Sequence, residues 1–251
     1  ATEAEQFFKT YYRPSNMVLA VVGDVKAAEI LPLIDRYFGR IPAGPKPAEL
    51  NTIEPAQFAE RTVVMRDASQ PIYIECYQRP GYNDPDDAVY DAISQILSGG
   101  RTSRMYRSLV RDKKIALDAG GASGFPGYKY PNLFYYYALP TQGKAPADVQ
   151  TAIREEIEKL KTSDVTDEEL DRVKTNAKAG VLRGLASNSG LAFQLTTAQM
   201  RYGDWREIFR QVERIDKVTK ADIRRVANKT FVPSKRTVGL IENDATAKGG
   251  K

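Results

Sequence analysis

The side chains best able to do chemistry lie between residues 98 and 117, where cations are dense. Gly99 and Gly100 end one helix, and a second helix restarts almost at once. Met105 and Leu109 fall on one face of this second helix. Six cations crowd the rest of it: Arg101, Arg104, Arg107, Arg111, Lys113 and Lys114. Such cations can bind carboxylates, but a basic helix face is more often simply solvated, and the sequence leaves both interpretations open.

The chain contains no histidine and only one cysteine. Ser-His-Asp and Cys-His catalysis are therefore excluded, and so are the HExxH zinc motif and its inverted form. We predict no catalytic residue and no metal-binding residue in this chain. The carboxylates at 167–169 follow Thr166 in the pattern of a capping box, so we interpret them as a helix start rather than an acid-base pair.

The composition is that of an ordinary globular protein, with 251 residues, 42% hydrophobic and 27% charged. The net charge of +5 is spread along the chain, so we predict no nucleic-acid partner. No apolar run approaches the roughly 20 residues of a membrane span. Helix-forming sequence follows directly after Ala1, so we expect a processed or truncated N-terminus. Cys76 lies in an alternating apolar run and is expected to be a buried thiol.

The first part of the chain predicts a helix over 2–12, a strand over 16–22 and an amphipathic helix over 27–38. The second of these helices contains a proline, and its apolar side chains are expected to face inward: Ile30, Leu33, Ile34, Tyr37 and Phe38. Three prolines then lie close together, at 42, 45 and 47. We interpret 44–54 as a stiff linker and 1–43 as the end of a preceding domain.

The remainder predicts an α+β domain over 55–243, followed by a disordered tail over 244–251. Strands are expected over 61–66, 71–77, 115–121 and 133–139. Helices are expected over 83–98, 101–114, 145–162, 166–185, 191–201 and 205–212. A glycine-dense segment over 120–127 is interpreted as a bulged hairpin or a mobile loop, which implies antiparallel pairing of the strands beside it.

The end of the chain repeats its beginning. Residues 219–243 parallel residues 2–24, since each contains a helix, an aromatic residue shortly before Pro-Ser, and an apolar strand. Tyr12 matches Phe231, and Pro14 matches Pro233. The chain therefore looks like the end of one unit followed by a complete second unit of the same kind.

Three motifs are distinctive in combination: YYRPSNMVLAVVGD at 11–24, YFGRIP at 37–42 and ILSGGRTSRMYRSLV at 96–110. They resemble the M16 family of zinc metallopeptidases, which includes pitrilysin, insulinase and mitochondrial processing peptidase. The resemblance covers residues 1–243 and is greatest to bacterial members built from two similar halves. It implies that each half is an α/β roll, an antiparallel sheet backed by helices. The zinc-binding HxxEH motif of the family lies in the front of the first half and is absent from this sequence.

The resemblance implies the C-terminal, non-catalytic part of a zinc metalloendopeptidase, inactive by itself, that encloses and positions unstructured peptides. In the family an Arg, followed seven residues later by a Tyr, helps to position substrate; the matching positions here are Arg111 and Asp118. The arginine is therefore present and the tyrosine is replaced. The substrate-binding candidates are Arg111, Tyr106 and Arg104. Zinc is expected only in the intact protein, on residues that this chain lacks.

The partners implied are the N-terminal catalytic domain of the same protein, a peptide substrate, and either a second M16 subunit or an identical copy. Family habit suggests the bacterial periplasm or envelope, and the cytoplasm stays open. Two other hypotheses also stay open. One is a naturally non-catalytic homologue acting as a structural or assembly subunit, and the other is a basic module that binds RNA or another anion.

Overall fold

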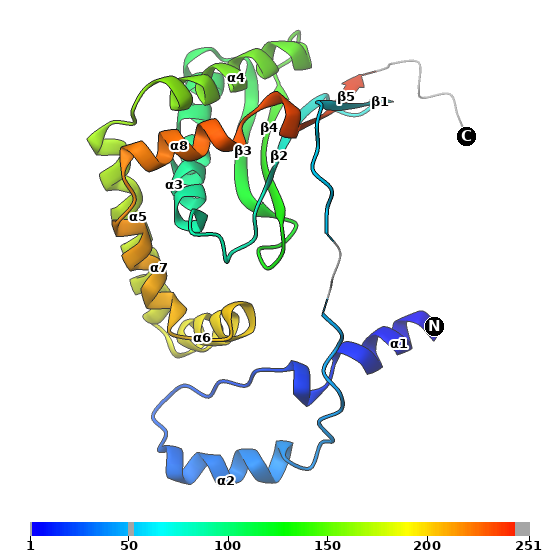
Figure 1. Cartoon of the computed structure of the whole chain (residues 1–251), viewed down its shortest axis with the longest axis vertical. Helices are drawn as coiled ribbons and strands as arrows, with labels where there is room; N and C mark the ends of the chain where they lie inside the picture. Colours follow the sequence, from blue (N-terminus) through cyan, green and yellow to red (C-terminus); the bar gives the residue numbers. More distant parts are fainter. Residues whose placement is uncertain (1, 50–52, 244–251) are drawn as a thin grey trace. The chain divides into compact units, whose positions relative to one another are not determined.

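The computed structural model describes residues 2–49 and 53–243, which divide into two compact units (Figure 1). The first unit comprises Ala1–Ile53 and Ala177–Val212, and the second comprises Glu54–Asn176 and Glu213–Lys251. The domain predicted over 55–243 is continuous in sequence, whereas residues 177–212 group with the first unit. The predicted tail over 244–251 and part of the predicted linker lie outside the described residues.

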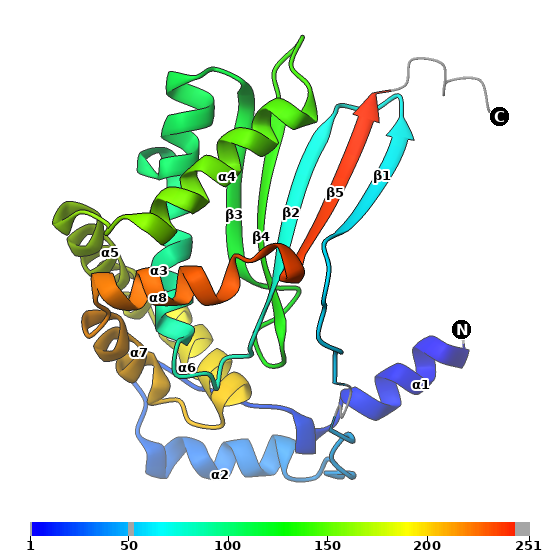
Figure 2. The ribbon, with the colours of Figure 1, turned by 45° about the horizontal axis from the view of Figure 1, so that its top comes forward.

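The second unit contains a sheet of five strands in the order β1-β5-β2-β4-β3 (Figure 2). The strands are β1 (Arg61–Asp67), β2 (Ile72–Arg79), β3 (Ala116–Phe125), β4 (Asn132–Pro140) and β5 (Arg236–Asn243). The pairs β5-β2, β2-β4 and β4-β3 are antiparallel, whereas β1 runs parallel to β5. The predicted α+β class, with a largely antiparallel sheet backed by helices, is confirmed.

One face of this sheet carries the hydrophobic core. Alternate residues of β2 and β4 point to that face, where Tyr77 lies opposite Phe134 and both are almost completely buried. Three helices cover it: α3 (Asp87–Ser98), α4 (Pro146–Thr162) and α8 (Lys220–Thr230). Figure 2 shows α4 crossing in front of the strands. The apolar stripes of these helices join the same core cluster, in which Ile93, Ile153 and Val226 are fully buried.

The basic stretch after α3 forms irregular helix rather than a plain α-helix. A 3-10 turn, η2 (Gly100–Thr102), is followed by the π-helix η3 (Tyr106–Asp112). The wider winding is visible where the Lys113 amide donates to the Ser108 carbonyl, five residues earlier, at 2.9 Å. Met105 and Leu109 are fully buried, so the predicted apolar face is confirmed.

Two expectations about the strands need correction. Residues 120–125 continue β3 instead of forming a loop, although a register shift between Ser123 and Phe125 confirms the expected bulge. Cys76 is half-buried on the face of the sheet away from the core, because its neighbours Glu75 and Tyr77 take the buried positions of β2. Partial burial still raises the pKa of the Cys76 thiol to about 11.

Three further helices follow α4: α5 (Asp167–Leu185), α6 (Asn188–Tyr202) and α7 (Glu207–Asp216). The capping box at the start of α5 is confirmed, since the Glu169 amide donates to Thr166 Oγ1 at 3.1 Å and the Thr166 amide donates to Glu169 Oε2 at 3.0 Å. Among the described residues, no helix combines the length and the hydropathy needed to cross a membrane.

The first unit contains α1 (Thr2–Tyr11), the 3-10 turn η1 (Pro14–Asn16) and α2 (Ala27–Phe38), which confirms both predicted helices. The strand predicted over 16–22 is wrong for this structure, because no described segment pairs with it. The expectation that the α2 side chains face inward is also wrong, since Leu33, Tyr37 and Phe38 are 43%, 60% and 52% exposed. The apolar pattern is present, but among the described residues no sheet buries these side chains.

The two repeated segments have the same local backbone. A 3-10 turn begins at Pro14 in the first copy and at Pro233 in the second (η4, Pro233–Lys235), each between residues in extended conformation. Their surroundings differ. Phe231 is 2% exposed and β5 pairs on both sides, whereas the matching Tyr12 is 60% exposed.

Candidate functional site

The predicted candidate Arg104 is held by a carboxylate of its own unit. Its Nε and Nη2 donate to the two carboxylate oxygens of Glu169, each at 2.7 Å, and both side chains are less than a fifth exposed. Burial alone would raise the pKa of Glu169, but the hydrogen bonds from Arg104 and Thr166 outweigh it and lower that pKa to about 2. Arg104 therefore clamps the segment before η3 to the start of α5.

The other two predicted candidates are more accessible. The Arg111 side chain is 54% exposed and is bound by its sequence neighbour, with Nε donating to Asp112 Oδ1 at 2.7 Å. Tyr106 is half-buried at the start of η3. The structure thus places Arg104 in a structural ion pair and leaves Arg111 in an exposed, local one.

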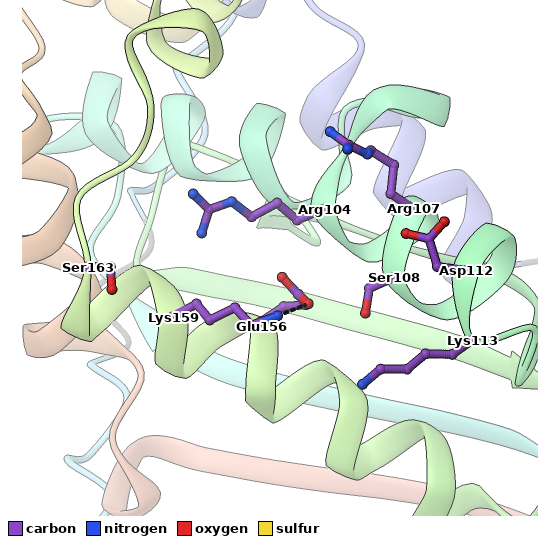
Figure 3. Close-up of a pocket in the computed structure, with 8 residues that line it drawn as sticks. All are labelled: Arg104, Arg107, Ser108, Asp112, Lys113, Glu156, Lys159 and Ser163. Carbon is purple, nitrogen blue, oxygen red and sulfur yellow. Dashed lines mark hydrogen bonds and ion pairs between the residues drawn. The ribbon is translucent and has the colours of Figure 1, made fainter.

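Arg104 also lines a pocket of about 480 Å³ formed by η3 and α4 (Figure 3). The pocket carries both signs of charge, from Arg104, Arg107, Lys113, Lys159, Asp112 and Glu156. Lys159 donates to Glu156 at 2.7 Å, and Lys113 pairs with Glu155 of α4. Most of its cations are already paired. We therefore interpret the pocket as an ionic cluster between two helices rather than as a strong anion-binding site.

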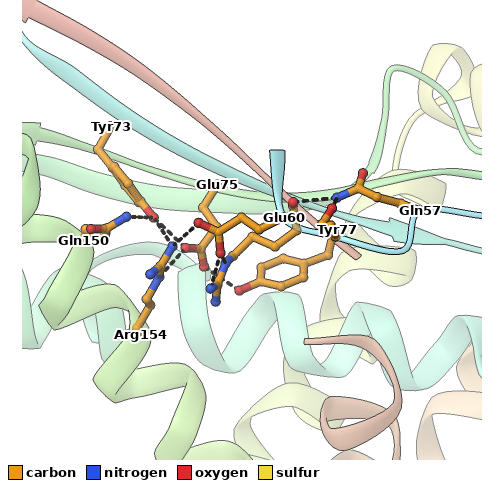
Figure 4. A network of polar contacts seen from close by, with 9 residues as sticks. Gln57, Glu60, Tyr73, Glu75, Tyr77, Gln150 and Arg154 are labelled. Carbon is orange, nitrogen blue, oxygen red and sulfur yellow. Dashed lines mark hydrogen bonds and ion pairs between the residues drawn. The ribbon is translucent and has the colours of Figure 1, made fainter. Parts of the chain in front are cut away.

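A buried carboxylate lies at the centre of a second polar network (Figure 4). Glu75 of β2 is 0% exposed and accepts hydrogen bonds from the hydroxyls of Tyr73 and Tyr77 and from Arg154 Nε, the last at 2.9 Å. Burial first, and then the charge of Glu75, raises the pKa of both tyrosines. Glu60 extends the network toward β5 by accepting from Arg236 Nε at 2.7 Å. All of its groups face partners within the fold, so we interpret it as structural.

The face of the sheet away from the core is half-buried and mainly apolar or aromatic. Ile74 lies opposite Tyr137, and Cys76 lies opposite Tyr135. The rings of Tyr135 and Tyr137 stack with centroids 6.5 Å apart, and Phe125 packs on the edge of Tyr135 at 5.5 Å. We call this surface the open face and define it by Ile72, Ile74, Cys76, Tyr135, Tyr137 and Leu139.

A carboxylate stands beside these rings. Asp118 of β3 lies opposite Leu139, and its Oδ2 accepts the Tyr137 hydroxyl at 2.7 Å. This hydrogen bond, together with burial, raises the pKa of Tyr137 to about 12. Gly120 leaves room for the ring, because a Cβ there would lie 3.2 Å from Tyr137 Cε1. In the described part of the chain, Asp118 has no ion pair with a cation.

Sequence reasoning did not find the open face. The alternation in 133–139 indicates which residues share a face, but three consecutive tyrosines give no sign of which ones are buried. The pairing of Asp118 with Tyr137 depends on the register of β3 against β4, and the bulges in β3 hide that register from the sequence.

The described residues show no cluster that could hold a metal ion. The chain contains no histidine, and the described residues include no group of three or more Cys, Asp or Glu side chains arranged to hold a metal ion. The half-buried face of the sheet is the most distinctive surface of this α+β domain.

Comparison with known proteins gives the family. The model of the peptidase M16 inactive domain matches residues 1–177. The zinc protease PqqE of Helicobacter pylori is 28% identical over 249 residues, which cover 96% of this chain and 54% of that protein. A crystal structure of a protease from Helicobacter pylori superposes with a TM-score of 0.84 at 24% identity, over 96% of this chain and 59% of that one. The periplasmic protease PqqL of Escherichia coli superposes with a TM-score of 0.73 at 17% identity, over 98% of this chain and 29% of that one.

The chain belongs to the peptidase M16 family, and its match is to the inactive domain, which lacks the catalytic zinc site. The suspected resemblance to M16 peptidases is thereby confirmed. The chain spans about half the length of the curated relatives it matches.

Proposed function

We propose that this chain is the part of an M16 zinc metalloendopeptidase that encloses and positions unstructured peptide substrates, and that it does not cleave peptides by itself. The observation that carries this proposal is the open face of the sheet, which presents half-buried aromatic and aliphatic side chains on the side away from the core. Large amphipathic rings on a rigid strand are the side chains that contribute most to binding extended chains.

The edges of the sheet favour an unstructured peptide, rather than a folded protein, as the ligand. The strands β1 and β3 lie at the two edges, and every residue of β1 is exposed. An extended peptide can pair its backbone with such an edge, whereas a folded protein has already paired its own backbone groups.

Arg111 is a second candidate contact within this proposal. Its guanidinium is exposed and is bound by an adjacent carboxylate, so a peptide carboxylate can replace Asp112 at little cost. Arg104 is bound bidentately by Glu169 and is therefore proposed to hold the fold around Arg111 and Tyr106 in place.

We also infer that residues 1–43 complete a second domain of the same kind, the catalytic one, in a longer protein. The repeat supports this inference, because β5 is flanked by a strand on each side while the matching run over 17–22 carries exposed Met17, Leu19 and Val21. Strands supplied by another part of the protein would pair with the backbone of this run, as β1 and β2 pair with β5. From the family resemblance we also propose that the protein pairs with a further M16 subunit or with an identical copy.

The expected location in the bacterial periplasm or envelope likewise stays a proposal. It is supported by the description of the Escherichia coli protease PqqL as periplasmic, a protein to which this chain is similar in fold.

The test is peptide binding by the whole 251-residue chain. We expect a short, fluorescein-labelled, unstructured peptide with a central norleucine to bind, and Tyr135→Ala to weaken that binding about tenfold, the effect of removing a central aromatic contact. Fluorescence anisotropy measures the dissociation constants. Lys161→Ala, on the helix side of the sheet, is the control and should leave binding unchanged. No binding, or equal losses for both variants, would contradict the proposal.

A further inference from the structure

We propose that Asp118 and Tyr137 form a subsite on the open face for a cationic side chain, a lysine or an arginine, of an extended peptide. This inference rests on the proposed function and names the class of peptide that the open face prefers.

The carboxylate is fixed in place and has bonding capacity to spare. The Tyr137 hydroxyl occupies Asp118 Oδ2 at 2.7 Å, and a carboxylate can accept several further hydrogen bonds through its two oxygens. Both residues belong to paired strands, so neither is on a flexible loop. The absence of a side chain at Gly120 allows the Tyr137 ring to lie against β3 and reach Asp118.

Asp118 differs in what it contacts from three other buried or half-buried acids of this unit. Glu75 is bound by Arg154, Asp87 by Arg79, and Glu169 by Arg104. Among the residues described, the polar partner of Asp118 is the neutral phenol of Tyr137. A negative charge that the fold itself leaves without a counter-charge, on an otherwise apolar surface, attracts a cation from a ligand.

The surroundings suit the rest of a lysine or arginine side chain. The aliphatic stem of such a side chain can pack on Ile74 and Leu139, which lie opposite Tyr137 and Asp118 in the strand register. The stacked rings of Tyr135 and Tyr137 offer aromatic faces that attract an ammonium or guanidinium group. Carboxylate, ring face and apolar floor thus converge within two neighbouring strand pairs.

The experiment compares two peptides that differ at one position, with lysine in one and norleucine in the other, on the whole 251-residue chain. We expect the lysine peptide to bind about fivefold more tightly, the size of a single ion pair on a partly exposed surface. Asp118→Asn should remove this preference, because asparagine still accepts the Tyr137 hydroxyl but carries no charge. Tyr137→Phe, which frees the carboxylate to rotate, should reduce the preference.

A control variant separates a local effect from a change in net charge. Glu158→Gln removes one negative charge from an exposed side chain of α4, on the other side of the sheet. This variant should keep the full preference for lysine. Equal affinities for the two peptides, or a preference that survives Asp118→Asn, would overturn the subsite while leaving the open face as a peptide surface. Failure of both peptides to bind would overturn the proposed function along with it.

Discussion

Replacing Glu75 by alanine is expected to lower the free energy of unfolding of the second unit by about 3 to 5 kcal/mol. Glu75 is completely buried and is the common acceptor for two tyrosine hydroxyls and the Arg154 guanidinium. Removing it strands the two buried tyrosine hydroxyls and leaves the Arg154 guanidinium, which is 32% exposed, with Glu60 at 3.7 Å as its remaining carboxylate partner. Urea unfolding followed by circular dichroism measures the change.

Two further variants show whether the loss comes from the network. Glu75→Gln keeps an acceptor for the tyrosines but offers Arg154 no charge, so we expect about half the loss. Glu158→Ala removes an exposed glutamate from α4, paired with Lys161, and should change stability by less than about 0.5 kcal/mol. A loss below about 1 kcal/mol for Glu75→Ala would show that the buried network contributes little to stability.

Replacing Gly121 by alanine is expected to cost about 2 to 3 kcal/mol, because β3 approaches β4 too closely there for any side chain. A Cβ at Gly121 would lie 2.2 Å from the Tyr135 carbonyl oxygen and 2.7 Å from Tyr136 Cδ1. The first of these atoms belongs to the backbone of a central strand and cannot move without disturbing the sheet. The same unfolding assay measures the cost.

Gly127 provides a matched control in the same glycine-dense segment. Nothing lies within 4 Å of a Cβ placed there, and its φ angle is not in the left-handed region. Gly127→Ala should therefore change stability by less than about 0.5 kcal/mol, or stabilise slightly by restricting the unfolded chain. Equal effects of the two substitutions would contradict the close approach of β3 to β4.

These glycines show why the strand prediction stopped too early. Sequence patterns treat a run such as 120–127 as a turn, because glycine is conformationally free and rare in strand interiors. Here Gly120 and Gly121 lie inside β3, where the rings of Tyr137 and Tyr136 occupy the space that side chains would need. Glycine is needed at these positions because of contacts between two strands, and such contacts cannot be predicted from the local sequence pattern.

The first unit shows a different limit of sequence reasoning. The apolar run over 16–22 has the composition of a buried strand, and its partner segment at the other end of the chain is one, as β5. Local composition predicts what a segment can become, whereas pairing decides whether it does. The family, the fold class and the apolar face of η3 were predictable because they depend on motifs and spacing. The charge compensation around Arg104 was not, because Glu169 lies sixty-five residues away.

The measurement that tests the central claim most directly is photo-crosslinking of a benzophenone-labelled, unstructured peptide to the whole chain, with the modified residues identified by mass spectrometry. The account predicts that crosslinks fall on the open face, at Ile74, Leu139 and their neighbours on β2 and β4. Crosslinks confined to the end of α4 on the helix side, for example at Lys159 and Ser163, would contradict it.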